Sequence, residues 1–284
     1  WRCYELKDRP GLIFIRNPFT AKGQRYWISR SLRDYTKAPN VVNLPPMLFN
    51  EQAISDWWNY SHQVKDKNLR KRLKYAMRWA TLGYHHDWDT KVYNEKMKNE
   101  FPSDLKQLTR FCGNALGFKN YSAEAAIVNF YPIGTTLSGH TDHSESDLDA
   151  PLFSFSFGQT AIFLIGGQTK EEKPVAMFLR SGDIVVMSKE SRLCYHAVPK
   201  VMKSKDEPWK EICEEDEQEN EKETHDSKRL KLSETSKTSF YGMDENLWKD
   251  CEDDNFWLDY QNYLVDCRIN FNVRQVLKEG QTSL

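Results

Sequence analysis

The sequence lacks a long apolar run, cysteines paired at C-x-x-C spacing, and a large net charge, since its formal value is only −1. No membrane-spanning segment is expected, because the longest uncharged stretch, 150–169, alternates polar and apolar residues as two strands would. The six cysteines stand without a secretory leader, which favours free thiols and a reducing, intracellular compartment. With 40 basic against 41 acidic residues, the whole chain also lacks the basicity typical of nucleic-acid binding.

The charge is nevertheless distributed unevenly along the 284 residues. Residues 1–80 hold 16 Lys and Arg against six acids, a net of +10, whereas 206–226 hold eleven acids and two lysines. The near-neutral total is therefore a cancellation, and the basic part suits a phosphate backbone. A helical stretch expected over about 51–78 ends in a basic run, for which a solvated helix face is the alternative interpretation. The predicted backbone contacts are Arg70, Lys71 and Arg72.

Hydrophobic patterning predicts a double-sheet antiparallel β architecture. Alternation such as Phe153-Ser154-Phe155-Ser156-Phe157, with turns between short strands, carries that prediction. The fold class expected for the whole chain is α+β, with a double-stranded β-helix (jelly-roll) core and N-terminal helices packed on one sheet. A loop is expected around 83–89, and Ser103 is expected to cap the helix that follows. The expected parts are a helical, basic extension with a nucleotide-recognition region (1–120), the jelly-roll core (121–202 and 256–278), and an acidic, disordered insertion (203–255).

A His-x-Asp motif is the first candidate for chemistry. In extended backbone, residues i and i+2 point to the same side, so His140 and Asp142 can bind one ion together. His196, near the end of the following set of strands, is the best candidate for a third ligand. Two histidines and one carboxylate form the facial triad of non-haem Fe(II) oxygenases, although a zinc hydrolase also uses this set and a bare H-x-D is common.

The last predicted strand helps to separate these alternatives. Arg268, Asn270, Asn272 and Arg274 share one face of it, and apolar residues occupy the other. Two guanidinium groups that point inward from a core strand are costly unless anions meet them. A dicarboxylate such as 2-oxoglutarate supplies those anions, whereas a zinc hydrolase has no need of them; a solvent-facing edge strand is the remaining alternative.

These motifs together closely resemble the AlkB family of Fe(II)/2-oxoglutarate-dependent nucleic-acid dioxygenases. The similar segments, spanning roughly 75–200 and 264–278, include Asn129-Phe130-Tyr131-Pro132 leading to His140-Thr141-Asp142, PLFSFSFGQTAIFLIGG at 151–167, LRSGDIVVMSKESRLCYHAV at 179–198, and the R-x-N-x-x-x-R of Arg268 to Arg274. The stretch Arg-Trp-Ala-Thr-Leu-Gly-Tyr at 78–84 is most similar to the animal AlkB homologue 1 branch.

The resemblance implies a role for each matching residue. It implies that His140, Asp142 and His196 bind Fe(II), and that O2 is the other co-substrate beside 2-oxoglutarate. Ser144 stands where the bacterial founder of the family has an Asp that helps to read the methylated base, which puts a preference for classical alkylation lesions in doubt. The implied 2-oxoglutarate ligands are Asn129, Tyr131, Arg268, Asn270 and Arg274, and the implied substrate contacts are Trp79, Tyr84, Ser144 and Arg192, although both aromatic residues also suit a core.

The expected function is oxidative demethylation, or methyl oxidation, of bases in unpaired or flipped DNA or RNA. The resemblance implies N6-methyladenine in DNA, N1-methyladenosine or 5-methylcytosine in tRNA, and a secondary abasic-site lyase activity. Expected partners are single-stranded, bubble or stem-loop DNA or RNA including tRNA, with a monomeric chain in the nucleus, the mitochondrion or the cytoplasm. The alternatives are a protein-directed oxygenase of the histone type and a catalytically silent binding module, which has no need of the full ligand set.

Overall fold

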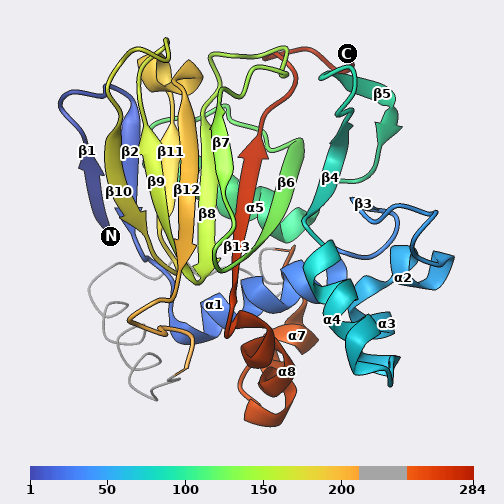
Figure 1. Cartoon of the computed structure of the whole chain (residues 1–284). Helices are drawn as coiled ribbons and strands as arrows, with labels where there is room; N and C mark the ends of the chain where they lie inside the picture. The colour runs from blue at the N-terminus through green and yellow to red at the C-terminus, as the bar shows by residue number, and fades with distance from the viewer. Residues whose placement is uncertain (211–241) are drawn as a thin grey trace, which may run out of the picture.

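The computed structural model describes residues 1–210 and 242–284, and two antiparallel sheets that face each other form its centre (Figure 1). The larger sheet has the order β1-β2-β11-β8-β13-β6-β4-β3, with β5 also paired to β4, and the smaller has the order β10-β9-β12-β7. The bounds are β1 (Arg2–Glu5), β2 (Leu12–Arg16), β3 (Val41–Val42), β4 (Trp79–His86), β5 (Tyr93–Lys98), β6 (Ala125–Pro132), β7 (Leu137–His140), β8 (Leu152–Gly158), β9 (Thr160–Ile165), β10 (Val175–Leu179), β11 (Ile184–Met187), β12 (His196–Met202) and β13 (Cys267–Arg274).

The larger sheet has one apolar and one polar face along its central strands. In β8 the three phenylalanines are fully buried, and the serines between them point to the opposite side, toward the smaller sheet. In β13, Asn270 pairs with Ser156 and Asn272 with Ser154, so the polar side chains of both strands share the inner face. This confirms the predicted jelly-roll core and places the polar face of the last strand inside it.

Helices cover the apolar face of the larger sheet, as predicted. The rings of Trp27 and Tyr35 lie 6.5 and 5.9 Å from that of Phe271 on β13. Figure 1 shows α5 behind the strands, and α1, α3, α4, α7 and α8 in the lower part of the molecule. No helix within the described ranges is long and apolar enough to cross a bilayer. The helical elements are α1 (Ala21–Ser29), the π-helical turn η1 (Arg30–Asp34), α2 (Glu51–Ser55), α3 (Trp57–Gln63), α4 (Lys67–Ala76), α5 (Ser103–Ala115), the 3-10 turn η2 (Lys189–Leu193), α7 (Glu245–Asp250) and α8 (Asp254–Leu264).

The N-terminal third differs from the prediction in several ways. Residues 1–120 are not a separate helical extension, because β2 and β4 pair with β11 and β6 inside the larger sheet. The stretch 51–78 is divided among α2, α3 and α4, and Pro102, without a side-chain cap, precedes α5 in place of Ser103. The loop expected at 83–89 is largely the end of β4. Gly83 has φ +69° there, and a side chain on it would collide with the carbonyl of Glu124.

The expected disordered insertion is ordered at both described flanks. Trp209 and Leu247 are fully buried, and Arg25 donates hydrogen bonds to the carbonyl oxygens of Trp209 and Lys210 at 2.8 and 2.7 Å. The prediction for 203–255 is therefore wrong for 203–210 and 242–255, and 211–241 lies outside the described residues. The buried side chains of Trp209 and Leu247 and the hydrogen bonds of Arg25 hold these flanks in place. The many acidic residues of the segment made these contacts hard to predict from the sequence.

Candidate metal centre and active site

Three ligand-bearing side chains meet at the end of the smaller sheet. His140 ends β7 and His196 begins β12, and the two residues are directly paired in the sheet. Their ring centroids lie 4.3 Å apart. Asp142 follows β7 by two residues, with Oδ2 at 3.6 Å from His196 Nε2 and Oδ1 at 4.0 Å from His140 Nε2. One ligand atom from each residue thus falls within 4.8 Å of the others, as a facial triad requires.

Backbone carbonyls fix the orientation of both imidazoles. Nδ1 of His140 lies 2.8 Å from the carbonyl oxygen of Ser138, and Nδ1 of His196 lies 3.1 Å from that of Cys194. Because a carbonyl oxygen only accepts, Nδ1 carries the proton in each neutral ring and Nε2 keeps its lone pair. Burial also lowers the pKa of His196, which favours the neutral form that binds metals.

The carboxylate of Asp142 has one engaged and one free oxygen. Oδ1 accepts a bond of 2.9 Å from Arg274, whereas Oδ2 is buried without a hydrogen-bond partner in the described chain. Burial alone would raise the pKa of Asp142, but the guanidinium of Arg274 and the two imidazoles hold it well below its usual range. A buried, ionised oxygen beside two available Nε2 atoms fits a divalent cation.

A small cavity of about 30 Å³ lies next to this cluster, between the two sheets. Arg268 on its wall is 1 % exposed, donates from Nη2 to Ser156 Oγ at 2.9 Å, and leaves Nε and Nη1 without a partner among the described residues. Burial lowers the pKa of Arg268 to about 10. A desolvated guanidinium with vacant donors is the group that a carboxylate would satisfy, so the cavity fits an anionic co-substrate.

The other predicted anion ligands lie around Arg268 in different ways. Tyr131 lines the cavity, and its ring centroid is 5.6 Å from the guanidinium carbon. Asn270 also lines it and donates to Ser154 Oγ and to the carbonyl of Phe155. Asn129 pairs directly with Asn270 across β6 and β13 and so shares the inner face, but it is not among the cavity-lining residues.

Of the two predicted substrate aromatics, the structure brings only Trp79 toward an exposed aromatic group. Its ring centroid lies 5.0 Å from that of Trp88, which is 44 % exposed and stands edge-on to His86 at 4.8 Å. Tyr84 is 1 % exposed and packs in a small core with Tyr93. Sequence reasoning missed Trp88 and His86, although the His-His-Asp-Trp run directly after Tyr84 offered a signal.

Arg192 braces the metal loop, and Glu145, which sequence reasoning missed, is its partner. Arg192 donates to the carbonyl oxygens of Asp142 and Ala150 at 2.7 and 3.0 Å and to Glu145 Oε2 at 2.9 Å. Ser144, half-buried in the same loop, makes no side-chain hydrogen bond within the described ranges. The signal for Glu145 was its place three residues after the metal-motif aspartate.

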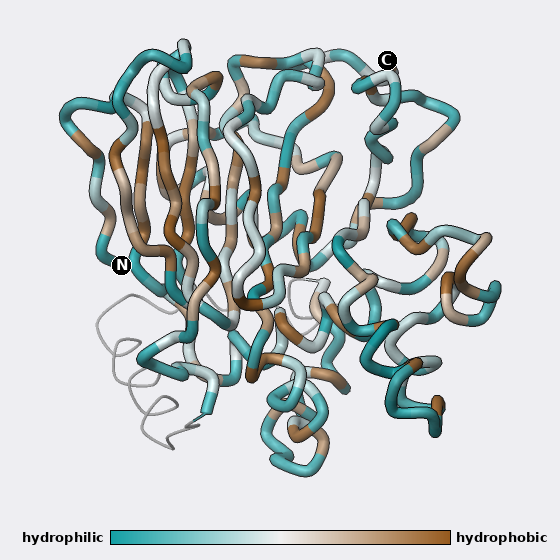
Figure 2. The backbone as a smooth tube through the Cα atoms, viewed as in Figure 1, coloured by the Kyte–Doolittle hydropathy of each residue, from teal (hydrophilic) through white to brown (hydrophobic). Residues whose placement is uncertain are grey.

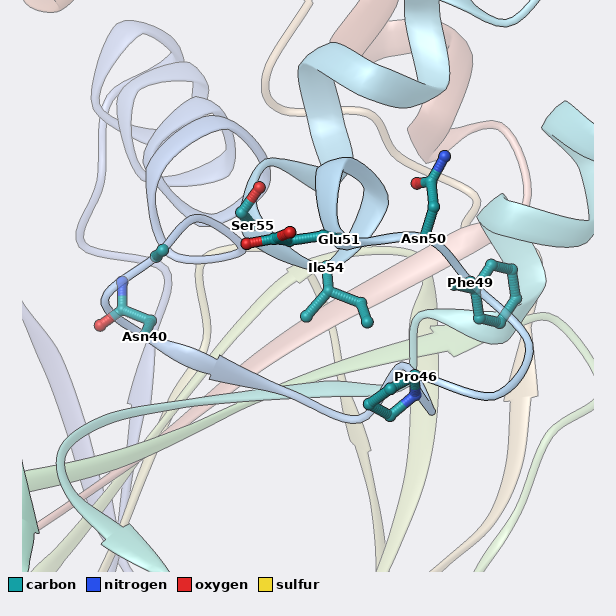
Figure 3. A pocket seen from close by; sticks show the side chains of 8 residues that line it. Asn40, Pro46, Phe49, Asn50, Glu51, Ile54 and Ser55 are labelled. Carbon is teal, nitrogen blue, oxygen red and sulfur yellow. The ribbon is translucent and has the colours of Figure 1, made fainter.

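The predicted backbone contacts lie on a different part of the molecule. Arg70, Lys71 and Arg72 are exposed on α4, which Figure 2 shows as strongly hydrophilic. The guanidinium of Arg72 lies 5.3 Å from the ring centroid of Phe49. Phe49 in turn lines an open groove of about 500 Å³, together with Pro46, Asn50 and Ile54, as Figure 3 shows.

Comparison with known proteins agrees with this geometry. The model of the 2OG-Fe(II) oxygenase superfamily matches residues 11–274. The chain is 39 % identical to the nucleic acid dioxygenase ALKBH1 of Mus musculus, over 99 % of this chain and 68 % of the mouse protein. It is 35 % identical to the tRNA demethylase abh1 of Schizosaccharomyces pombe, over 71 % of this chain and 72 % of the yeast protein.

A solved structure also shares the fold. The structure of OsALKBH1 aligns with a TM-score of 0.51 at 17 % sequence identity, over 96 % of this chain and all of that one. At this identity the match supports the fold alone. The superfamily match and the identity to the curated relatives establish the family. The chain therefore belongs to the 2OG-Fe(II) oxygenase superfamily and, within it, to the ALKBH1 branch of the AlkB family.

Proposed function

We propose that this dioxygenase oxidises methyl groups on bases of unpaired or flipped DNA or RNA and thereby demethylates them. The observation that carries the proposal is that Asp142 Oδ2, between two available imidazoles, and Arg268 Nε and Nη1, in the adjacent cavity, are buried without a hydrogen-bond partner among the described residues. Both halves of the site fit what the superfamily uses, a divalent iron and a dicarboxylate. The target base must leave the helical stack, because a methyl group inside a duplex cannot reach a buried metal.

Each group of residues has a distinct proposed role. His140, Asp142 and His196 would hold Fe(II). Tyr131, Arg268 and Asn270, which line the cavity, would bind 2-oxoglutarate, and Asn129 and Arg274 are proposed to assist from beside the cavity. When bound, iron and 2-oxoglutarate would supply the oxidising chemistry: 2-oxoglutarate would lose CO2 and take up one atom of O2 to become succinate, and the other atom would enter a C–H bond of the methyl group. A hydroxymethyl group on nitrogen then leaves as formaldehyde, whereas one on carbon stays. The chain itself orients the ligands, places the co-substrate carboxylates and keeps water from the cavity.

The proposed path for the substrate combines stacking with charge. The exposed ring of Trp88, supported by Trp79, offers a face on which an unpaired base can stack. The exposed cations Arg70, Lys71 and Arg72 on α4 suit the phosphate backbone, and the groove beside Phe49 gives apolar surface next to them. Tyr84, by contrast, is committed to the core and is not proposed as a contact.

The proposed targets are N6-methyladenine in DNA and N1-methyladenosine or 5-methylcytosine in tRNA, with abasic-site cleavage as a secondary activity. The name of the yeast relative, a tRNA demethylase, supports tRNA among them. Ser144 supports a preference away from classical alkylation lesions, because a hydroxyl there replaces a carboxylate that would accept hydrogen bonds from a base amino group.

The test is turnover on a panel of methylated substrates. Single-stranded, bubble, duplex and stem-loop DNA and RNA, each with one modified base, are incubated with Fe(II), 2-oxoglutarate and O2, and succinate and the product base are measured. We expect turnover on unpaired substrates and none by Asp142→Ala. Turnover on a methylated histone peptide but on no oligonucleotide would contradict the proposal in favour of a protein-directed oxygenase. Turnover on nothing would point to a binding module.

We also propose that the chain acts as a monomer in an intracellular, reducing compartment: the nucleus, the mitochondrion or the cytoplasm. Support comes from the class of substrate and from three buried cysteines, Cys112, Cys251 and Cys267, whose pKa burial raises to about 12, which keeps the thiols protonated. Light scattering of the purified chain and fractionation of cells that express it would test these two statements.

A further inference from the structure

Buried charges form a closed ring around the metal-motif carboxylate. Arg274 binds Asp142 Oδ1 at 2.9 Å, and Arg192 binds the carbonyl oxygen of the same residue at 2.7 Å. Glu145 bridges the two guanidiniums, with Oε2 at 2.9 Å from Arg192 and Oε1 at 3.4 Å from Arg274. The hydroxyl of Tyr93 on β5 completes the ring, at 3.2 Å from Arg274.

The position of Glu145 in this ring is unlike that of an ordinary surface acid. Its side chain is fully buried, as are most of those of Arg192 and Arg274, which are 2 % and 5 % exposed. Removing one member of a buried charge set leaves the others uncompensated, so such a set keeps its geometry. Within the described chain Glu145 makes no hydrogen bond or ion pair with Asp142 or with either histidine, yet both arginines that hold Asp142 depend on it.

Each arginine fixes a different part of Asp142. Arg274 engages Oδ1 of the side chain, which leaves Oδ2 facing His196 at 3.6 Å. Arg192 donates to the main-chain carbonyl oxygen of Asp142, which fixes the backbone position from which the carboxylate extends. We propose that Glu145 is a positioning residue of the metal centre: it holds Arg192 and Arg274 so that Asp142 presents Oδ2 toward the histidines. The proposal rests on the proposed role of Asp142 as a metal ligand.

Two simpler roles for Glu145 make different predictions. If Glu145 only anchors the loop after β7, its loss lowers stability and leaves the metal affinity of the folded chain unchanged. If it acts only through its charge, any nearby carboxylate has a comparable effect on cation binding. Glu172 offers a matched comparison, because it is exposed, lines a cavity on the other side of His196, and forms no ion pair with either arginine among the described residues.

The experiment measures Mn(II) binding to the whole chain, without nucleic acid or turnover. Free Mn(II) is followed by its electron paramagnetic resonance signal for the unaltered chain and for Glu145→Gln, Glu145→Asp and Glu172→Gln, and circular dichroism confirms that each is folded. Changes to partners of metal ligands typically weaken affinity about 10–100-fold. We expect a loss in that range for Glu145→Gln, a smaller loss for Glu145→Asp, and a change below about twofold for Glu172→Gln.

Equal Mn(II) affinity of folded Glu145→Gln and the unaltered chain would overturn the proposal, and so would an equal loss in Glu172→Gln. If Glu145→Gln does not fold, Tyr93→Phe removes the hydroxyl group that accepts from Arg274 at 3.2 Å and donates to Glu145 Oε1 at 3.5 Å, and a loss of about two- to tenfold is expected for each such hydrogen bond; unchanged affinity there would overturn the proposal as well. Mn(II) binding that survives His140→Ala would overturn the metal site itself and the role of Glu145 with it.

Discussion

Replacing Arg268 with Met is expected to stabilise the unloaded chain and to remove its response to 2-oxoglutarate. The guanidinium of Arg268 is buried with one hydrogen bond, to Ser156, and with two nitrogens lacking a partner in the described chain. Burial lowers the pKa of Arg268 to about 10. At neutral pH, keeping this group charged in the folded chain therefore costs about 3 kcal/mol, a cost that starts to fall when the pH rises through that pKa and is gone only above the ordinary pKa of arginine.

The bond to Ser156 offsets part of that cost, because a hydrogen bond from a charged donor contributes about 1.5–3 kcal/mol. Met has a similar volume and no charge, and replacing buried ions by apolar side chains often stabilises a protein by about 1–4 kcal/mol. We therefore expect Arg268→Met to raise the free energy of unfolding by about 1 kcal/mol. In a chain of this size that raises Tm by about 2–4 °C.

The assay is thermal unfolding with and without 2-oxoglutarate, in the presence of Mn(II). At 100 times its Kd, a ligand stabilises the folded chain by about 2.7 kcal/mol. 2-Oxoglutarate should stabilise the unaltered chain by this amount and should not stabilise Arg268→Met. Arg268→Met should therefore have the higher Tm without the co-substrate, and the unaltered chain the higher Tm with it. Arg180→Met is the control, since Arg180 is exposed. A lower Tm of the unloaded variant would refute the buried-charge argument, and a full response to 2-oxoglutarate would refute the anion role.

Three further changes test the substrate path and the fold. Trp88→Ala removes the exposed stacking face, and we expect binding of single-stranded oligonucleotides to weaken by about 1–3 kcal/mol in fluorescence anisotropy, with 2-oxoglutarate binding unchanged. Neutralising Arg70, Lys71 and Arg72 together should reduce the slope of log Kd against log salt by about 0.7 for each phosphate that the variant no longer neutralises. An unchanged slope would show that this face of α4 contacts solvent and not nucleic acid. Gly83→Ala should lower the free energy of unfolding by about 1–3 kcal/mol or more, because φ is +69° and the Glu124 carbonyl occupies the space of the methyl group; an unchanged urea midpoint would contradict this.

The parts of the site that depend on local periodicity were predictable from the sequence. A strand alternates its side chains, so the inward face of β13 followed from the residues alone, as did the shared side of His140 and Asp142. The structure also pairs His140 with His196, although 55 residues separate them. His196 was predicted from chemistry and not from periodicity, because an H-x-D motif needs a third ligand to make a metal site.

The parts that depend on long-range contacts were not predictable in this way. Glu145 is close to the H-x-D motif in the sequence, but its partners, Arg192 on η2 and Arg274 on β13, are not. Only the folded chain brings the three side chains together. The burial of Tyr84, which is 1 % exposed, was likewise not predictable from the pattern of β4. Gly83 has a positive φ and the β4–β5 register shifts between Tyr84 and His86, and the rings of Tyr84 and His86 lie 6.4 and 5.5 Å from that of Tyr93 on β5.

The charges of the site explain why its two ends suit different ligands. Near the metal motif, Asp142 and Glu145 balance Arg192 and Arg274, so the ring is neutral and can accept a cation only because Asp142 keeps one oxygen free. Arg268 lies in the cavity without an acid, which leaves a surplus positive charge for an anion. A divalent cation and a dicarboxylate that bind together leave the total unchanged, whereas either one alone alters it by two charges. In a cavity of low dielectric, each ligand should therefore strengthen the binding of the other.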